Sequence, residues 1–243
     1  YVELGTTLGE ALIAPTKIYV KTLKEADYDL VAGGYHKWID GKITYTIALQ
    51  DEPWAKFMIM GPYTKLYKKS FLQENNIKFV KVNIGEDIYF NLQVNALAKK
   101  VKIIDYVGYY WYTNNESISN TMHKDIKNLE IDKMLNGSYD SLIEKNAINP
   151  NNKELIELYY YNFIIWVLQW TTKNTKFKDM SKEYDRLFKW LKERFPNYKK
   201  NKLIGINKPE GERFVVRIMF FIFMIMHKLH LGKIGVFIFS RMR

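Results

Sequence analysis

Hydrophobic and polar positions follow mixed strand-like and helix-like periods up to about residue 112, and a helical period from about residue 125. Near the start, Thr7 and Glu10 form a capping-box pattern that predicts a helix reaching about Glu25, kinked or interrupted at Pro15. The apolar run at residues 28–32 ends in two glycines, which predicts a short buried strand that stops there.

Asp40-Gly41 lies at the centre of residues 35–47 and predicts a β-hairpin, because Asp-Gly supplies the positive φ angles of a tight turn. A short helix is expected at 54–60, followed by a turn at Gly61-Pro62 and a second short helix at 70–75. A longer helix is expected at 85–99, because Lys99 and Lys100 at its end interact favourably with the helix dipole. Strands at 101–104 and 107–112, separated by Asp105, and a polar loop at 113–121 complete this part of the chain.

Beyond residue 125 the pattern predicts helices. Residues 155–170 are apolar on all sides, which indicates a buried helix. Leu187, Phe188 and Leu191 form an amphipathic stripe with Tyr184 and Phe195, in a helix that Pro196 ends.

The last part of the chain, about residues 199–243, combines many basic residues with the apolar run 218–226, which is too short to span a bilayer. Arg213, Arg217 and Lys228 fall near one helical stripe and leave the other sides apolar. This pattern favours a basic amphipathic helix lying on an anionic membrane surface. A core helix with solvated arginines and a nucleic-acid-binding helix are the alternatives, although no nucleic-acid-binding module accompanies the charge.

Composition narrows the class of protein. The chain has 243 residues, 47% hydrophobic, which is enough for a packed core, and a net charge of +11, which indicates an anionic partner: nucleic acid, a membrane leaflet or a phosphorylated substrate. It has no cysteine and only four histidines, so a disulfide scaffold, a thiolate metal site and a histidine-based metal site are not expected.

Glu86 and Asp87 follow Gly85 at the predicted start of a helix. Two acids in this position ordinarily cap the helix and stabilise its dipole. The functional alternative is general-base chemistry, which requires an ionised and oriented carboxylate next to a cleft. A helix N-terminus is expected to lower the pKa of such a carboxyl and fix its direction.

Four segments occur in a fixed order: ADYDLVAGGY at 26–35, GPYTKLYKKSFL at 61–72, GEDIYFNL at 85–92 and YYWYTNNESIS at 109–119. Together they resemble the family-2 glycosyltransferases of the GT-A fold, the bacterial enzymes that build capsules, wall polymers and lipopolysaccharide. In that family the corresponding patterns are a strand that follows the metal-binding acids, G-P-W-N-K-L-Y, G-E-D-x-x-F-N-L and Y-Y-Y-R-x-x-x-x-S-I-S.

The resemblance implies an α/β fold: the acceptor-side half of a GT-A domain at residues 1–124, followed by an α-helical C-terminal region at 125–243. It implies an inverting transfer of a sugar from a nucleotide-diphosphate donor to a hydroxyl of a cell-surface glycan or lipid-linked acceptor. Asp87 would be the catalytic base, with Glu86 beside it as the second catalytic carboxylate. Acceptor binding would fall to Gly61, Tyr63, Thr64, Lys65 and Trp111.

The chain also departs from the family pattern. Tyr63 and Thr64 replace the common Trp and Asn, and Tyr112 replaces an Arg that could contact the diphosphate. Lys65 is the candidate to supply that charge, unless it is a solvated lysine on a turn. Trp111 is a candidate to stack on a sugar, although aromatic residues in strands are more often core.

Tyr1 aligns with the last residue of the family's D-S-D-D-Y segment. The resemblance therefore implies that the uridine-binding strands and the D-x-D motif, which binds Mg²⁺ or Mn²⁺, lie upstream of Tyr1. Asp27, Asp29 and Asp40 are not expected to replace these ligands, so no metal site is expected in this chain. The expected location is cytoplasmic, peripheral on the inner face of the membrane, without a nucleic-acid partner. The alternative is a non-catalytic membrane-associated interaction module.

Overall fold

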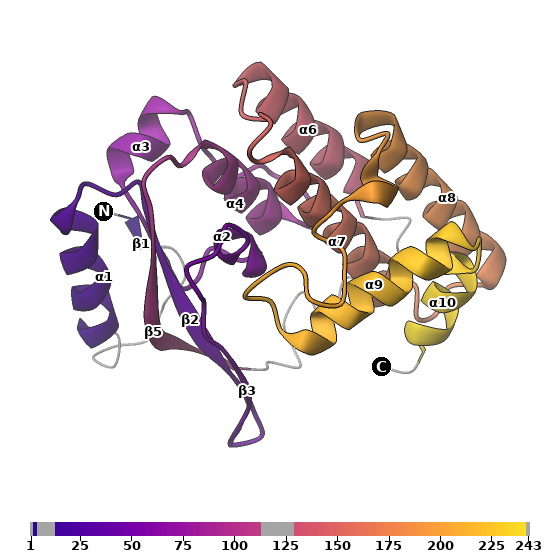
Figure 1. Cartoon of the computed structure of the whole chain (residues 1–243), viewed down its shortest axis with the longest axis horizontal. Helices are drawn as coiled ribbons and strands as arrows, with labels where there is room; N and C mark the ends of the chain where they lie inside the picture. The colour runs from indigo at the N-terminus through magenta and orange to yellow at the C-terminus, as the bar shows by residue number, and fades with distance from the viewer. Residues whose placement is uncertain (1, 4–12, 113–128, 242–243) are drawn as a thin grey trace. The chain divides into compact units, whose positions relative to one another are not determined.

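The computed structural model describes residues 2–3, 13–112 and 129–241, with side chains described from Lys17 onward within these ranges. The chain divides into two compact units, residues 1–114 with 131–147 and residues 115–130 with 148–243. The predicted polar loop at 113–121 and the capping box at Thr7 and Glu10 lie outside the described residues. The fold is mixed α/β, as expected, with strands in the first unit and helices in both (Figure 1).

The first unit is built on a five-stranded sheet with β2 (Leu30–Ile39) at its centre. One edge of β2 pairs antiparallel with β4 (Lys65–Tyr67) and β3 (Lys42–Ile47), and β1 (Val2–Glu3) pairs with β4. The other edge pairs in parallel with β5 (Val101–Tyr112), which runs beside β2 in Figure 1. The three-residue strand β4 was not predicted, because it is too short to show a period.

Helices cover both faces of this sheet. Helix α1 (Ile13–Glu25) packs Tyr19 and Leu23 against Val31 and Leu66 on one face. Helices α2 (Ala55–Met58), α3 (Lys69–Glu74) and α4 (Glu86–Leu97) pack against the other face, where Leu30 and Ala32 point. Leu30, Val31 and Ala32 thus alternate between the two faces, as side chains on a buried strand must.

The hairpin prediction is confirmed, but the predicted end of the strand at Gly33-Gly34 is wrong. Ile39 pairs with Lys42 across Asp40 and Gly41, whose φ angles are 48° and 78°. The two glycines lie inside β2 because no side chain fits there. A Cβ on Gly33 would lie 2.1 Å from the Tyr19 hydroxyl, and one on Gly34 would lie 2.0 Å from the Ile47 carbonyl oxygen.

Residues 101–112 form one strand instead of the two predicted strands. Asp105 does not end the strand; it lies in a bulge, because Ala32 pairs with Ile103 while Gly34 pairs with Val107. A second shift follows between Gly34 and Tyr35, which pairs with Tyr109. A bulge keeps a strand continuous while leaving extra residues unpaired.

The predicted helices around residues 54–60, 70–75 and 85–99 are confirmed as α2, α3 and α4. Helix α4 ends at Leu97, so Lys99 and Lys100 lie after it and not in its last turn. Their backbone N–H groups donate to the Asp29 carboxylate at 2.9 and 3.0 Å. Pro15 is the third residue of α1, and residues 4–12, which precede this helix, lie outside the described ranges.

Helix α6 (Ile131–Glu144) belongs to the first unit, although the boundary predicted from sequence was at 124/125. It packs against α4, and Ser141 and Lys145 both donate to the Gln93 side-chain oxygen, at 2.9 and 2.5 Å. These bonds fasten the helix that begins with Glu86 and Asp87.

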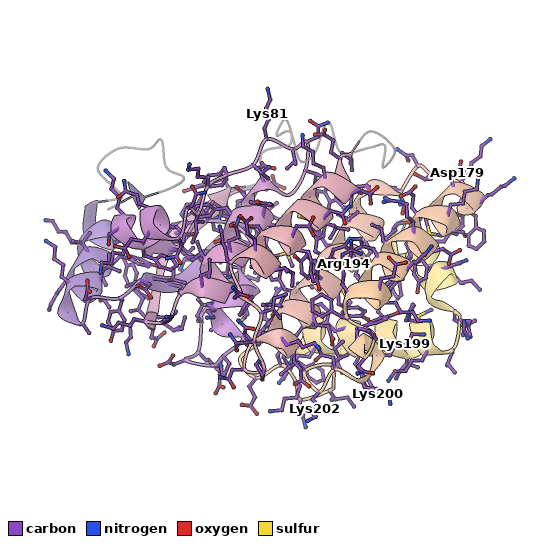
Figure 2. All side chains as sticks on the ribbon, turned by 90° about the horizontal axis from the view of Figure 1, so that it is seen from above. Lys81, Asp179, Arg194, Lys199, Lys200 and Lys202 are labelled. Carbon is purple, nitrogen blue, oxygen red and sulfur yellow. The ribbon has the colours of Figure 1, made fainter. Side chains whose placement is uncertain are left out.

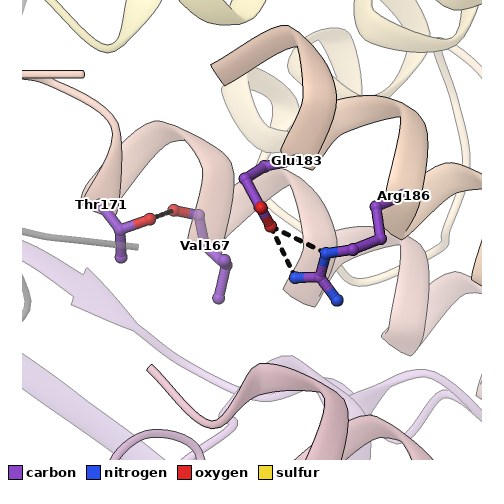
Figure 3. A network of polar contacts seen from close by, with 4 residues as sticks. All are labelled: Val167, Thr171, Glu183 and Arg186. Carbon is purple, nitrogen blue, oxygen red and sulfur yellow. Dashed lines mark hydrogen bonds and ion pairs between the residues drawn. The ribbon is translucent and has the colours of Figure 1, made fainter. Parts of the chain in front are cut away.

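The second unit contains the predicted buried helix α7 (Lys153–Thr171) and the predicted amphipathic helix α8 (Phe177–Arg194), which ends before Pro196. Tyr184, Leu187, Phe188 and Leu191 are buried on α8. A partly buried ion pair on α8 joins two nitrogens of Arg186 to Glu183, at 2.9 and 2.6 Å (Figure 3). At the end of α7, the Thr171 hydroxyl donates to the Val167 carbonyl.

The basic tail begins with a short 3₁₀ turn, η3 (Tyr198–Lys200), and forms α9 (Phe214–Lys228) and α10 (Gly232–Phe239). Phe220, Phe223 and Met224 of α9 are buried, and the Tyr161 hydroxyl of α7 donates to the Phe220 carbonyl at 3.1 Å. Among the described residues, no helix is both long enough and apolar enough to cross a bilayer.

Candidate active site

The two candidate acids stand in the first turn of α4, in different surroundings. Gly85 precedes them in the left-handed conformation, with φ 81°, and its carbonyl accepts from the Tyr89 N–H at 2.8 Å. Glu86 is exposed and Asp87 is half-buried. Glycine suits this position because a positive φ angle is costly for residues that carry a side chain.

The environment of Asp87 raises the pKa of its carboxyl to about 6, the opposite of the expected direction. Burial is the largest cause, and repulsion from the Glu86 carboxylate adds to it, while the nearby Lys65 amine works against both. Desolvation therefore outweighs the helix dipole here. A carboxylate with this pKa is ionised at neutral pH and is a better proton acceptor than an ordinary aspartate.

Lys65 is buried, not solvated on a turn. Its Nζ donates to the carbonyl oxygens of Ile59 and Gly61, at 2.6 and 3.3 Å, and to the Asn91 side-chain oxygen at 3.0 Å. Burial lowers the pKa of this amine to about 7, and attraction from Asp87 opposes that change. Its three donors are used within the protein, an arrangement that does not favour a direct contact with a diphosphate.

Asn91, one turn after Asp87, is a buried residue of this candidate site that the sequence analysis did not single out. It is fully buried, accepts from Lys65 Nζ and the Tyr67 hydroxyl, and donates to the carbonyls of Met60 and Asp87. A polar residue four positions from Asp87, on the packed side of a helix, was the available signal. The bond to the Asp87 carbonyl, at 2.9 Å, helps to hold the first turn of α4 in place.

The turn before β4 brings Gly61, Tyr63 and Thr64 together. Thr64 is buried with φ 66°, a conformation that is costly for a β-branched residue, and its Oγ1 has no hydrogen-bond partner among the described residues. Its carbonyl accepts from the Gly33 N–H at 2.9 Å, which ties the turn to the sheet. Such strain persists only where the surrounding structure holds it.

Tyr63 lies in an aromatic cluster that we call the aromatic wall: Tyr35, Tyr63, Tyr109 and Trp111. Tyr63 stacks on Tyr109 with ring centres 5.1 Å apart and contacts Trp111 at 5.7 Å. Burial is the main cause that raises the pKa of the Tyr63 hydroxyl, and the charges of Tyr45, Tyr109 and Asp87 add to it. Within the wall, the pKa of Tyr63 therefore responds to Asp87.

Trp111 is 38% exposed, and the Lys37 ammonium lies over its ring at 3.5 Å from the centre. One face of the indole is therefore already used by a cation, and the remaining exposed part is what a ligand would reach. The structure thus gathers Asp87, Gly61, Tyr63, Thr64 and Lys65 around the start of α4. Trp111 contacts this group through Tyr63. Glu86 lies at its exposed edge. Lys37 and Tyr35 were not foreseen.

No group of three or more metal-ligating side chains occurs among the residues that the structure describes. The aspartates that follow the start of the chain are engaged elsewhere: Asp27 pairs with Lys68 at 2.7 Å, and Asp29 accepts from two backbone N–H groups. They do not fit the role of divalent-cation ligands. A pocket of the first unit, lined by residues such as Glu52, Lys56 and Lys99, does not include Asp87.

No protein-family model matches the chain. A stretch of 25 residues is 80% identical to a phosphoribosylformylglycinamidine cyclo-ligase of Lachnospira eligens, and covers 10% of this chain and 7% of that protein. A stretch of 54 residues is 48% identical to the protein of the same name from Agathobacter rectalis, and covers 16% of each. The chain therefore spans a small part of these relatives.

Among solved structures, the chain is similar to S. aureus TarS residues 1–349, a glycosyltransferase, in complex with UDP-GlcNAc and with UDP. Both share 13% identity with this chain, with TM-scores of 0.37 and 0.36, and cover 81% of it. The chain spans 67% and 66% of those two structures. A likeness at these scores assigns neither a fold family nor a function to the chain.

Proposed function

We propose that the chain is the acceptor-side half of an inverting family-2 glycosyltransferase of the GT-A type, with Asp87 as the general base. The arrangement of Asp87 carries the proposal: a half-buried carboxylate with a pKa near 6, at a helix start fastened by Asn91. The four sequence segments that resemble the family support the reaction class, and each contributes a residue to the start of α4 or to the aromatic wall.

The proposed reaction transfers a sugar from a nucleotide-diphosphate donor to an acceptor hydroxyl. Asp87 takes the hydroxyl proton while the hydroxyl oxygen forms a bond to the anomeric carbon. The bond from that carbon to the donor diphosphate breaks on the opposite side, and the diphosphate leaves with the electron pair. The configuration at the anomeric carbon is therefore inverted, and Asp87 later releases its proton to solvent.

The remaining residues have positioning roles in this proposal. Tyr63, Thr64 and the exposed part of Trp111 would shape the acceptor pocket beside Asp87, and Glu86 would contact acceptor hydroxyls at its exposed edge. Lys65 and Asn91 would act through Asp87, because their hydrogen bonds join the turn at Gly61 to the first turn of α4, which contains Asp87. This assignment replaces the expected contact of Lys65 with the diphosphate.

The donor side is expected in the intact enzyme, with Mg²⁺ or Mn²⁺ holding the diphosphate. The described carboxylates do not fit that role, so the metal ligands would have to come from residues outside the described ranges or outside this chain. The proposed acceptor is a cell-surface glycan or a lipid-linked sugar. The proposed location is the cytoplasmic face of the membrane, with the protein bound peripherally.

A transfer assay on the full-length protein that carries this sequence tests the proposal. UDP-GlcNAc, the sugar nucleotide bound in the TarS structure, is the first donor to use. Asp87→Asn is expected to abolish transfer while donor binding, measured by calorimetry, is retained. Asp105→Asn, which changes an exposed carboxylate on β5, is the matched control and should transfer normally.

The pH profile gives a second criterion. If Asp87 is the base, kcat/KM should fall about tenfold for each pH unit below about 6, where its carboxyl becomes protonated. Near-normal turnover of Asp87→Asn would remove Asp87 from the role. If no sugar nucleotide binds the full-length protein, the enzyme proposal as a whole fails and a non-catalytic module is favoured.

A further inference from the structure

Helix α9 has an apolar face turned outward. Phe220, Phe223 and Met224 are buried on one side. On the other side, Val215, Ile218, Ile222, Ile225 and Leu229 follow one another at steps of three and four residues, the spacing of a single helical stripe. Val215 is 77% exposed and Leu229 is 63% exposed. A helix on a water-facing surface ordinarily carries polar side chains in this position.

Helix α10 and the turn before it carry a second exposed apolar stripe. Leu231, Ile234 and Ile238 repeat the same spacing and are 45 to 48% exposed. The two helices pack closely, since a Cβ on Gly235 would lie 2.7 Å from Cε of Met226, and they lie side by side in Figure 1. We call these eight side chains of α9, α10 and the turn between them the apolar face. Contiguous exposed apolar surfaces mark sites of interaction with proteins or membranes.

The charge around the apolar face selects between these partners. Residues 213–243 contain six basic residues and no acidic one. Arg213, Lys228 and Arg241 are exposed. Lys228 and Lys233 stand on either side of the α9–α10 turn, next to Leu229 and Leu231. An apolar surface in a segment whose charged side chains are all basic matches the acyl chains and phosphates of an anionic lipid leaflet.

A basic pocket opens beside the same turn. It is lined by Lys199, His227, His230 and Lys233, together with Tyr184 and Asp185. Asp185 pairs with Lys233 at 2.5 Å, and among the described residues Lys199 has no ion-pair partner. Figure 2 shows Lys199 with Lys200 and Lys202 along one edge of the second unit. Lys199 is therefore the cation of this pocket that is suited to the phosphate of a lipid headgroup, because Lys233 is paired with Asp185 and His227 is uncharged at neutral pH.

The turn itself is held in an unusual conformation. His230 has φ 61°, and the Leu231 N–H donates to the Met226 carbonyl at 2.7 Å, which is the pattern that glycine usually closes at a helix end. A histidine in this position costs stability relative to glycine. It places an imidazole, instead of a hydrogen atom, at the mouth of the basic pocket.

We propose that the apolar face and the basic pocket beside it form a docking surface for an anionic membrane. Helix α9 has 15 residues and is about 22 Å long, shorter than the roughly 30 Å hydrocarbon core, so it would lie in the interface. The eight apolar side chains enter the acyl boundary while Lys199, Lys228 and Lys233 meet headgroup phosphates. This surface rests on the proposed membrane location and is independent of the reaction at Asp87.

Vesicle flotation with the purified 243-residue chain tests the docking surface. Vesicles of phosphatidylcholine alone are compared with vesicles that also contain phosphatidylglycerol. The chain should float with the anionic vesicles, and Ile222→Asp with Ile225→Asp should lower its partition coefficient about tenfold or more. Ile143→Asp changes an isoleucine that is 50% exposed on α6, and this control should bind as the unaltered chain does.

Lys199→Gln and Lys233→Gln, each tested singly, should weaken binding to anionic vesicles by about fivefold. Circular dichroism of each variant shows whether it is folded, so loss of binding is read only from folded protein. The proposal is overturned if the chain stays unbound from anionic vesicles or if the double aspartate variant binds unchanged. It is also overturned if light scattering shows a lipid-free dimer that this variant dissociates, which would make a second copy the occupant.

Flotation does not depend on transfer. A chain that floats but never transfers sugar would sustain the docking surface and refute the proposed reaction. An enzyme that is active on a soluble acceptor but does not float would refute the docking surface and sustain the proposed reaction.

Discussion

The Asn91 side-chain oxygen accepts hydrogen bonds from Lys65 Nζ and from the Tyr67 hydroxyl, both at 3.0 Å. The amide nitrogen of the same side chain donates to the carbonyls of Met60 and Asp87, at 3.0 and 2.9 Å. One buried amide therefore joins the turn before β4, the strand itself and the first turn of α4. Through the bond to its carbonyl, Asn91 helps to position Asp87.

Asn91→Ala is expected to lower the free energy of unfolding by about 2–4 kcal/mol, because it removes four hydrogen bonds and leaves buried polar groups unpaired. Denaturant unfolding measures the change. Asn75→Ala is the matched control: its side chain donates one bond, to the Phe71 carbonyl at 2.8 Å, and should cost about 1 kcal/mol or less. Equal costs for the two variants would contradict the joining role of Asn91.

Asp87→Asn is expected to stabilise the protein. The folded state raises the pKa of this carboxyl from 3.8 to about 6, so keeping it ionised costs folding free energy above pH 6. Asparagine removes this cost, and the variant should gain about 1–2 kcal/mol at pH 8, after allowance for the partial exposure of the site.

The gain should shrink toward zero as the pH falls from about 6 to about 4. Over this range the wild-type carboxyl becomes protonated in the folded state, so the cost of burying its charge disappears. Unfolding curves of both proteins across this range test the sign. A variant that is less stable than wild type at pH 8 would show that the Asp87 carboxylate is stabilised and not strained.

Gly61→Ala is expected to destabilise the protein by about 1–3 kcal/mol. A Cβ on Gly61 would lie 2.1 Å from the Tyr63 ring, which is held against Tyr109 and Trp111 and cannot move away freely. At Gly205, in contrast, the nearest atom to an added Cβ is 3.9 Å away, so Gly205→Ala should be nearly neutral. Thermal unfolding of the two variants gives the comparison, and a harmless Gly61→Ala would show that the aromatic wall is loosely packed.

His227→Gln is expected to reduce the acid sensitivity of the protein. The ring of His227 bonds to the Tyr184 hydroxyl at 2.5 Å and to the Tyr198 hydroxyl. Burial, with repulsion from Lys199 and His230, lowers its pKa from 6.5 to about 4. Between these values the unfolded chain binds a proton that the folded chain does not, so wild-type stability falls as the pH drops from about 6.5 to about 4.

Glutamine does not titrate, and its amide can donate to one tyrosine hydroxyl and accept from the other. The stability difference between wild type and His227→Gln should therefore change in favour of the variant by about 1–2 kcal/mol between pH 7 and pH 5. Chemical unfolding at the two pH values measures it. A constant difference would mean that His227 titrates normally in the folded protein.

Local chemistry was enough to predict several elements. Asp40-Gly41 identified the hairpin because the positive φ angles are a property of those two residues. The acids before an amphipathic run identified the start of α4, and the spacing of Tyr184, Leu187 and Leu191 identified the buried side of α8. In each case the information lies within one turn or one helix.

The errors arose where contacts with distant segments of the chain determine the conformation or the burial of a residue. Gly33 and Gly34 read as the end of a strand, but Tyr19 and Ile47 approach so closely that glycine is needed inside the strand. Lys65 was expected either to contact the diphosphate or to be a solvated lysine on a turn. Its burial was not foreseen, because its acceptors come from Ile59, Gly61 and Asn91, and their convergence requires the folded β4–α4 packing. The pKa of Asp87 was expected to fall, because the sequence shows the helix dipole and not the depth of burial.

The two register shifts between β2 and β5 have a consequence for how the aromatic wall tolerates insertions and deletions during evolution. The second shift decides that Tyr109 and Trp111, and not Tyr110 and Tyr112, face Tyr63, since a slip of one residue exchanges the two sides of a strand. All four positions are aromatic, and Tyr110 and Tyr112 already pack against Trp38 on the other side. A single-residue insertion or deletion in the bulge would thus turn Tyr110 and Tyr112 toward Tyr63 in place of Tyr109 and Trp111. A strand with aromatic side chains on one side only would lose its contacts with Tyr63 after the same change.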